Sequence, residues 1–541
     1  MALRTIYRSL RTIRSISNPE KQHLNFQNFR RFISSDDQHK VSKGLVLGLY
    51  EKEDDKPVKL TTSGEKFDEK VQGTLMHLIK ESELTGKIGT GNVFNNVDSE
   101  YRSVAVVGLG REGAGFNELE MLDEGLENVR AAAGVGARKL QMQGCIEVYV
   151  DSMDYPEQAA EGSGLSIYRY QENKKKNEKT NVPKLELYDS SETNAWTRGI
   201  FKADAQNLAR KLTDAPSNLM TPTLFAQATV DALCPCGMTV EIRAMDWIQQ
   251  NHLNSFLYIA KGSCEPPILL EINYCGTAPE DKPVLLVGKG ITFNSGGICL
   301  RKARQMDQYR GSMAGAAVVV AAIRAAASLS LPINIAAVIP LCENMPSGMS
   351  CKPGDVITCL NGQILAIEQT NKAGVVVMAD PLVYAQKAYK PRMVIDVGTM
   401  GNGVIKGIGS GAAAVFSNSH FIWKQLQKAG SITGDRVWRM PLWKYYKSQV
   451  RNSISYDISN TGTGLASSCL AAAVLNEFVP TADWAHLDIR GVGMITREGA
   501  IPYLLRNRMT GRPTRTLIQF LYQMACSEQS NKSCSDKSKK S

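Results

Sequence analysis

A glycine-rich turn is the first feature of the sequence that could bind a ligand. Residues 108–113 read GLGREG and follow an apolar run at 103–107. Between a strand and a helix, the spacing G-x-G-x-x-G lets a pyrophosphate approach the backbone at the helix N-terminus. A dinucleotide site also needs an acidic residue at the end of a second strand about 20 residues later. Residues 118–127 follow a helical pattern instead, so we expect no nicotinamide cofactor.

Cysteine and histidine offer no recognisable metal site. The chain has 12 cysteines and 6 histidines, none in a C-x-x-C or H-E-x-x-H pattern. Cys234 and Cys236 stand one residue apart, but no nearby Cys or His pair completes a zinc site. We therefore interpret the cysteines as reduced, mostly buried thiols.

The composition is that of a soluble globular protein with more than one core. Of the 541 residues, 43% are hydrophobic and 21% are charged. No uninterrupted apolar run approaches the ~18–20 residues that span a bilayer. The most apolar stretch, 314–323, ends at Arg324 and predicts a buried helix. We expect no membrane partner.

The net charge of +10 is concentrated at the two ends of the chain. Residues 1–35 carry +6 and residues 527–541 carry +2, which leaves +2 for everything between them. A nucleic-acid-binding protein would need a basic surface on the folded body. The sequence therefore predicts no nucleic-acid partner.

The first 35 residues resemble a mitochondrial presequence. They are rich in Arg and Ser, contain Glu20 as their one acidic residue, and place apolar and basic side chains on different faces of a helical pattern. The segment RFISS (31–35) predicts that the presequence is cleaved near Ser34. We expect import into the mitochondrial matrix. A disordered basic arm is the alternative. Matrix import also agrees with the absence of a disulfide pattern.

Alternating strand and helix patterns predict an α/β protein. In an N-terminal α/β domain, 36–190, we expect strands at 44–49, 103–107 and 145–151, a helix at 118–143, and an exposed loop at 172–184. A linking helix follows at 191–213.

The C-terminal domain, 214–526, has predicted strands at 284–288, 333–340 and 393–397 and helices at 313–327 and 370–388. This order favours a largely parallel sheet covered by helices on both faces, with ligands at the carboxyl ends of its strands. Residues 527–541 read as a basic flexible tail.

Several long motifs between about 200 and 525 resemble the leucyl aminopeptidase (cytosol aminopeptidase) family. They are APSNLMTP (215–222), VGKGITF (287–293), PLCENMPSG (340–348), KPGDV (352–356), WAHLDIRG (484–491) and GRPTRTL (511–517). The resemblance implies a small N-terminal α/β domain, a larger C-terminal α/β/α domain with a mixed, largely parallel sheet, and a hexamer. It also implies two divalent ions, usually zinc, manganese or magnesium, which activate a water for peptide hydrolysis.

The first half of the family's metal site is altered in this chain. The family's VGKG lysine, a metal ligand, is kept as Lys289, but the bridging aspartate of F-D-S-G-G is Asn294. The catalytic lysine of S-L-K is Arg301. The ligand aspartate of R-[AG]-D-M-[AG]-G-A-A is Ser312.

The second half is altered more strongly. The family signature N-T-D-A-E-G-R-L aligns with QTNKAGVV (369–376) when counted back from ADPL (379–382). Asn371 and Ala373 therefore stand at the two acids, and Val375 stands at the catalytic arginine. Of five ligand positions only Lys289 keeps the family residue, and four negative charges are lost.

Two dications carry a charge of +4, which neutral oxygens do not offset. We therefore expect no bound metal, no other cofactor and no catalytic residue. Without metals, Lys289 should be protonated and donate to Asn294, Ser312 and Asn371, forming a hydrogen-bonded plug.

These losses, on a scaffold whose motifs are kept, predict an inactive homologue with a structural role. Insect sperm members of the family show similar losses and are linked to abundant structural material in sperm mitochondria. We therefore expect a hexameric building block in mitochondria. Three alternatives stay open: an atypical metal-dependent leucyl aminopeptidase that releases N-terminal amino acids, a regulatory subunit in mixed hexamers with paralogues, and a ligand-binding module with an open pocket.

Overall fold

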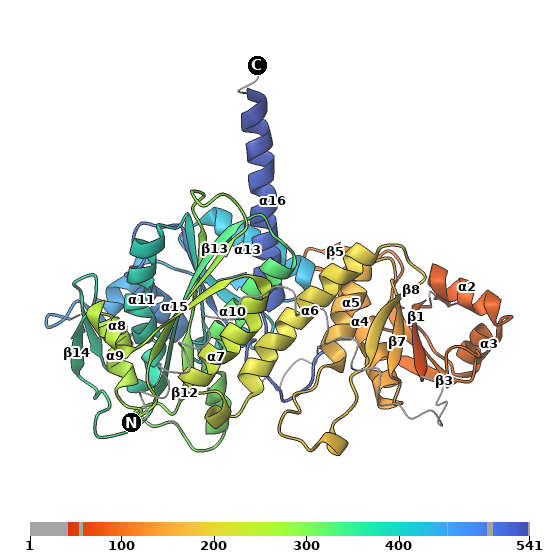
Figure 1. Cartoon of the computed structure of the whole chain (residues 1–541), viewed down its shortest axis with the longest axis horizontal. Coiled ribbons are helices and arrows are strands. Elements are labelled where there is room, and N and C mark those ends of the chain that lie inside the picture. Colours follow the sequence, from red (N-terminus) through yellow and green to blue (C-terminus); the bar gives the residue numbers. More distant parts are fainter. Residues whose placement is uncertain (1–41, 53–57, 452, 495–500, 539–541) are drawn as a thin grey trace, which may run out of the picture. The chain divides into compact units, whose positions relative to one another are not determined.

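The computed structural model describes residues 42–52, 58–451, 453–494 and 501–538 (Figure 1). Side chains are described as far as residue 526. The predicted presequence, 1–35, lies outside these residues. Residues Lys43–Ser541 form one unit, described below.

The N-terminal part of this unit is built around one sheet. Its strands are β1 (Lys43–Tyr50), β2 (Lys59–Leu60), β3 (Gly91–Asn95), β4 (Ser103–Gly110), β7 (Glu147–Asp151) and β8 (Lys184–Tyr188). The order is β3-β4-β1-β7-β8, with β2 beside β1. The pairs β4–β1, β1–β7 and β7–β8 are parallel, and β3 is antiparallel.

Side chains of β1 alternate between two helical layers, as the period of a strand requires. Leu45, Leu47 and Leu49 pack on the side of α2 (Thr62–Lys70) and α3 (Thr74–Glu81). Val46 packs on the side of α4 (Glu124–Met142) and α5 (Pro156–Ile167). Both faces are buried, which explains why this strand reads as a continuous apolar run.

The glycine-rich turn after β4 does not lead into a helix. Residues 116–123 form a short hairpin, β5 (Phe116–Asn117) and β6 (Leu122–Asp123), and α4 begins only at Glu124. The Asp123 side chain accepts from the Leu126 N–H at 3.2 Å, which fixes this start. The predicted helix at 118–143 was thus too long at its N-terminus. The turn lacks the strand-to-helix geometry of a dinucleotide site.

The C-terminal sheet has nine strands. They are β9 (Thr239–Arg243), β10 (Ile268–Cys275), β11 (Val284–Gly288), β12 (Gly290–Asn294), β13 (Asn334–Asn344), β16 (Met393–Gly398), β17 (Ala413–Ser417), β18 (Val437–Arg439) and β20 (Trp484–Asp488). The order is β18-β17-β20-β16-β11-β13-β10-β9, with β12 beside β13. The central pairs β13–β11, β11–β16 and β16–β20 are parallel, and β9, β10 and the β17–β20 pair are antiparallel.

Helices cover both faces of this sheet. One layer contains α6 (Thr193–Asp214), α7 (Pro222–Leu233), α10 (Ala314–Ser328), α13 (His420–Thr433) and α16 (Thr514–Ser538). The other contains α9 (Asn254–Ala260), α11 (Ala373–Tyr389) and α15 (Ser467–Asn476). The two-domain α/β architecture and the mixed, largely parallel sheet predicted from the sequence are confirmed.

The remaining elements are short. They are α8 (Met245–Gln250), α12 (Gly403–Ile408), α14 (Lys444–Val450), the small sheet of β14 (Asp355–Thr358), β15 (Ile364–Ile367) and β19 (Ile458–Ser459), and the 3-10 turns η4 (Lys176–Glu178), η5 (Ser217–Leu219), η6 (Cys234–Cys236), η7 (Met306–Met313) and η8 (Thr370–Lys372).

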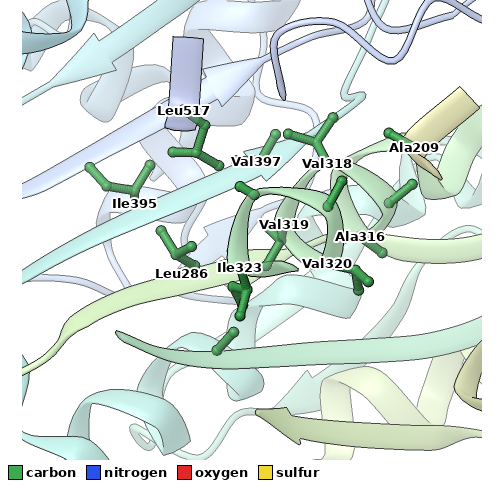
Figure 2. Close-up of a cluster of buried hydrophobic side chains, with 14 of the residues drawn as sticks. Ala209, Leu286, Ala316, Val318, Val319, Val320, Ile323, Ile395, Val397 and Leu517 are labelled. Carbon is green, nitrogen blue, oxygen red and sulfur yellow. The ribbon is translucent and has the colours of Figure 1, made fainter. Parts of the chain in front are cut away.

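Helix α10 packs directly onto the centre of the sheet. Its valines and Ile323 lie among Leu286 of β11, Ile395 and Val397 of β16, and Leu517 of α16 (Figure 2). A Cβ on Gly315 would lie 2.1 Å from the Val397 carbonyl oxygen, so only glycine allows this approach. Of the described chain, only Met306–Ser328 is long and apolar enough to cross a membrane, and it is largely buried in this core.

The C-terminal helix extends beyond residue 526, where the sequence placed the end of the C-terminal domain. Helix α16 continues to Ser538, through most of the segment interpreted as a flexible tail (Figure 1). Residues 514–538 contain no Pro or Gly that would end a helix.

A buried ion network joins the two parts of the unit. Glu161 of α5 accepts from Arg130 of α4 at 2.6 Å and from Arg515 of α16 at 3.0 Å. Arg515 also lies 3.4 Å from Asp435. Burial alone would raise the pKa of Glu161, but Arg130, Arg515 and Lys202 outweigh burial and lower it to about 2.

We predict that Gly315→Ala lowers the midpoint of thermal unfolding. The added methyl must displace the carbonyl of Val397, and overpacking of this kind costs about 1–3 kcal/mol. Gly407→Ala in α12 is the matched control, because nothing lies within 4 Å of a Cβ there. Equal midpoints for the two variants would contradict this account of the helix–sheet contact.

We also predict that Glu161→Gln destabilises the fold by about 3–5 kcal/mol at neutral pH, because Arg130 and Arg515 lose a buried partner. The folded pKa is depressed, so this contribution is present above pH 4.5 and is lost as the pH falls toward 2. The free energies of unfolding of parent and variant, measured by chemical denaturation, should therefore converge as the pH falls from 4.5 to 2.

The control for this prediction is Glu112→Gln, because Glu112 forms an exposed pair with Lys59. Its effect should stay below about 1 kcal/mol. A parent–variant difference for Glu161→Gln that does not change with pH would contradict the prediction.

Candidate functional site

The candidate site is a cavity of about 220 Å³ at the carboxyl ends of the central strands. Lys289 follows β11, Asn294 ends β12, and Thr399 follows β16. The residues that line the cavity are Lys289, Asn294, Arg301, Tyr309, Ser312, Gln369, Asn371, Lys372, Gly374, Thr399, Met400, Gly401, Asn402, Ser467, Arg490 and Met494.

Lys289 is held at the floor of this cavity by its backbone and its side chain. Its N–H donates to the Val397 carbonyl at 2.9 Å, and its own carbonyl accepts from Ala316 at 3.1 Å. The ammonium Nζ donates to Ser312 Oγ at 2.9 Å and to the Thr399 carbonyl at 2.6 Å. The predicted bond to Ser312 is present, but Thr399 takes the place of Asn294 and Asn371.

The charge of Lys289 also differs from the expectation. Complete burial lowers the pKa of Lys289 to about 7, and the cationic neighbours Arg301 and Arg490 add to this effect, while Asp488 opposes it. Lys289 is therefore not fully protonated at neutral pH. Neither the burial of Lys289 nor its closeness to Arg301 and Arg490 can be read from the sequence motifs.

Asn294 is engaged in holding the loop that follows β12. Its Oδ1 accepts from the Gly296 N–H at 3.0 Å and from Asn344 Nδ2 at 2.9 Å. Asn344 also donates to the Thr370 carbonyl at 3.0 Å, which ties this loop to the one before α11. The side chain of Asn294 thus serves the scaffold through its oxygen.

Arg301 bridges the same two loops. Its Nε donates to the Asn294 carbonyl at 3.2 Å, and Nη2 donates to the Asn371 carbonyl at 2.7 Å. The guanidinium carbon lies 3.9 Å from the centre of the Tyr309 ring. Arg301 therefore has a fixed position at the cavity wall.

Two of the predicted positions do not line the cavity. Ala373, the first residue of α11, is fully buried, and Val375 is 2% exposed. Val375 borders a small adjoining void of about 20 Å³, which shares Lys372, Gly374 and Ser467 with the cavity. Lys289, Asn294, Arg301, Ser312 and Asn371 are brought together as expected.

Sequence reasoning missed two cations of the site, Lys372 and Arg490. Lys372 directly follows Asn371 and is one of the lining residues. Arg490 lies within the WAHLDIRG motif, and its guanidinium carbon is 5.1 Å from the centre of the Tyr309 ring. Both residues stand inside quoted motifs, so their charge was available as a signal.

Comparison with known proteins identifies the family of this chain. The cytosol aminopeptidase family, catalytic domain, matches residues 207–518, and the N-terminal domain of the same family matches residues 46–177. The chain belongs to the cytosol aminopeptidase family. The resemblance inferred from the sequence motifs is thereby confirmed.

Relatives match over nearly the whole chain. The cytosol aminopeptidase of Xenopus tropicalis is 44% identical over 494 residues, covering 90% of this chain and 94% of that protein. The Homo sapiens protein of the same name is 44% identical over 487 residues, with 89% and 92% covered. Among solved structures, the bottromycin maturation enzyme BotP in complex with Mn has a TM-score of 0.77 at 26% identity, covering 90% of this chain and all of that chain.

The cavity residues do not fit the pair of divalent ions of the cytosol aminopeptidase family. Among the described residues that line the cavity, four are basic and none is an Asp or Glu. The Asn294 oxygen is already bonded to two N–H groups, and Ser312 accepts from Lys289. Across the described ranges, no group of three or more His, Cys, Asp or Glu side chains is placed to hold a metal.

Proposed function

We propose that this chain is a catalytically inactive member of the cytosol aminopeptidase family that acts as a self-assembling structural protein in mitochondria. The observation that carries the proposal is the cavity at Lys289, where the neutral residues Asn294, Ser312 and Asn371 stand at positions of the family's ligand carboxylates. We further propose a homohexamer, or a hexamer mixed with paralogues, without nucleic-acid or membrane partners.

The missing carboxylates bear directly on the chemistry. A bound divalent ion lowers the pKa of a water from 15.7 to ≈ 7 and so supplies hydroxide at neutral pH. Hard dications need anionic oxygen ligands, whereas Arg301, Arg490 and Lys372 present positive charge to this space. The arginine that the family uses beside the reacting groups is replaced by the apolar Val375.

The scaffold beside the cavity is nevertheless intact. Asp396 on β16 accepts from Trp484 Nε1 at 2.6 Å and lies 2.5 Å from His486 Nδ1, all within the sheet core. Trp484 and His486 belong to the WAHLDIRG motif that resembles the family, so this motif is kept although the catalytic side chains are replaced. General loss of function would have damaged both sets, so the contrast supports selection for folding or assembly.

The cellular part of the proposal comes from the N-terminal sequence. An Arg-rich, acid-poor amphipathic start supports import into the mitochondrial matrix. Together with the loss of ligands, this start supports a place among the sperm-type structural members of the family.

The alternative is a metal-dependent leucyl aminopeptidase with an atypical site. It is favoured by the 44% identity to proteins named cytosol aminopeptidase and by the fold shared with BotP, whose solved structure contains Mn. Under this alternative Asn294, Asn371 and Ser312 would supply neutral oxygen ligands.

The inactive protein and the atypical aminopeptidase are distinguished by measuring hydrolysis of leucine amide by the purified mature chain with manganese added. We expect no turnover above the uncatalysed rate. A variant with six substitutions should gain turnover, because it restores the four acids, the lysine and the arginine of the family. It combines Asn294→Asp, Ser312→Asp, Asn371→Asp, Ala373→Glu, Arg301→Lys and Val375→Arg.

A variant with only Arg301→Lys and Val375→Arg is the matched control and should stay inactive, since it lacks the acids. Native mass spectrometry of the parent should give six chains per particle. Manganese-dependent turnover by the parent would contradict inactivity, and a monomeric parent would contradict the proposed building block.

A further inference from the structure

We propose that the cavity at Lys289 binds a small organic or inorganic oxyanion that carries carboxylate or phosphate groups. The site would be a ligand pocket of reversed charge in the place where the family holds cations. The inference concerns the cavity of the single chain and does not depend on assembly or on the absence of catalysis.

The first support is the charge of the lining. Lys289, Arg301, Lys372 and Arg490 all line one cavity, and none of its described lining residues is an Asp or Glu. Within the described ranges, none of these four basic side chains has a carboxylate oxygen within the 4.0 Å of an ion pair. Basic groups that converge on a partly enclosed space without counter-ions create a positive potential that concentrates anions.

The second support is that two positive charges are held close together. Arg301 and Arg490 contact the same ring of Tyr309, at 3.9 and 5.1 Å, while the described acids Asp488 and Glu368 do not line the cavity. A bound anion would relieve the repulsion between the two arginines.

The third support is the way the two arginines are held. Arg301 is anchored by the carbonyls of Asn294 and Asn371, and both Arg301 and Arg490 lie against the ring of Tyr309, at 3.9 and 5.1 Å. Ordered guanidinium groups suit carboxylate and phosphate oxygens, because their N–H groups form a planar fork. The arginines are thus positioned before any ligand arrives.

Neutral donors also line the site, and the volume of the cavity suits a small ligand. Asn402 and Ser467 also line the cavity and can donate hydrogen bonds to ligand oxygens. A cavity of about 220 Å³ has room for a phosphate or a short dicarboxylate. The polar lining points to an anion of small size and high charge.

The test is isothermal titration of the purified mature chain with inorganic phosphate in one arm and succinate in the other, at fixed ionic strength. We expect saturable binding in at least one arm, and the tighter arm identifies the chemical group. Arg301→Gln and Arg490→Gln should each weaken that binding at least about tenfold, since each removes a charged hydrogen-bond donor. Arg490→Lys should recover part of the affinity.

The matched control is Arg304→Gln, because Arg304 is exposed, lies three residues from Arg301 and does not line the cavity. It should bind as tightly as the parent. If Arg301→Gln fails to fold, Arg490→Gln decides, since the side chain of Arg490 does not bridge the two loops. No saturable binding by the parent in either arm, or equal binding by parent and Arg490→Gln, would overturn the proposal.

Discussion

The balance of charge at the ends of the central strands decides what this molecule can do. Two divalent ions bring a charge of +4 into a partly buried space, and only anionic ligands make such a site stable. In this chain the same space is lined by Lys289, Arg301, Lys372 and Arg490. The altered charge disfavours cations and favours anions, so the proposed inactivity and the proposed ligand have one physical cause.

The backbone of Lys289 is bonded to the central sheet and to the helix that packs on it. Lys289 is tied to both neighbouring elements, since its N–H reaches the carbonyl of Val397 on β16 and its carbonyl accepts from Ala316 of α10. The close approach at Gly315 keeps α10 against the sheet and Ser312 beside Lys289. The walls of the cavity are therefore held by contacts of the backbone and of Ser312 with Lys289.

Much of the fold could be predicted from the sequence, because buried parallel strands and the helices between them have clear apolar patterns. Strands β4, β11 and β16 and helix α10 were found close to their observed bounds. The hairpin of β5 and β6 was missed because each strand has only two residues, too few to show a period. The extension of α16 was missed because its polar composition resembles a tail.

The residues of the site could be predicted where the motifs fix their positions in the chain. Contacts between segments far apart in the chain could not be predicted. Lys289, Asn294, Arg301, Ser312 and Asn371 follow from the spacing of the motifs and share one cavity. The contact of Lys289 with the Thr399 carbonyl, and the burial that lowers its pKa to about 7, depend on packing between elements far apart in the chain. The convergence of Arg490 on Tyr309 is of the same kind.

The most direct test of the central claim is crystallographic. Crystals of the mature chain, grown with zinc and manganese present, would be measured at the absorption edge of each metal. The account predicts no anomalous peak within bonding distance of Lys289, Asn294 or Ser312. Two such peaks beside Lys289 would contradict it, because the cavity would then hold dications without the carboxylates that the argument requires.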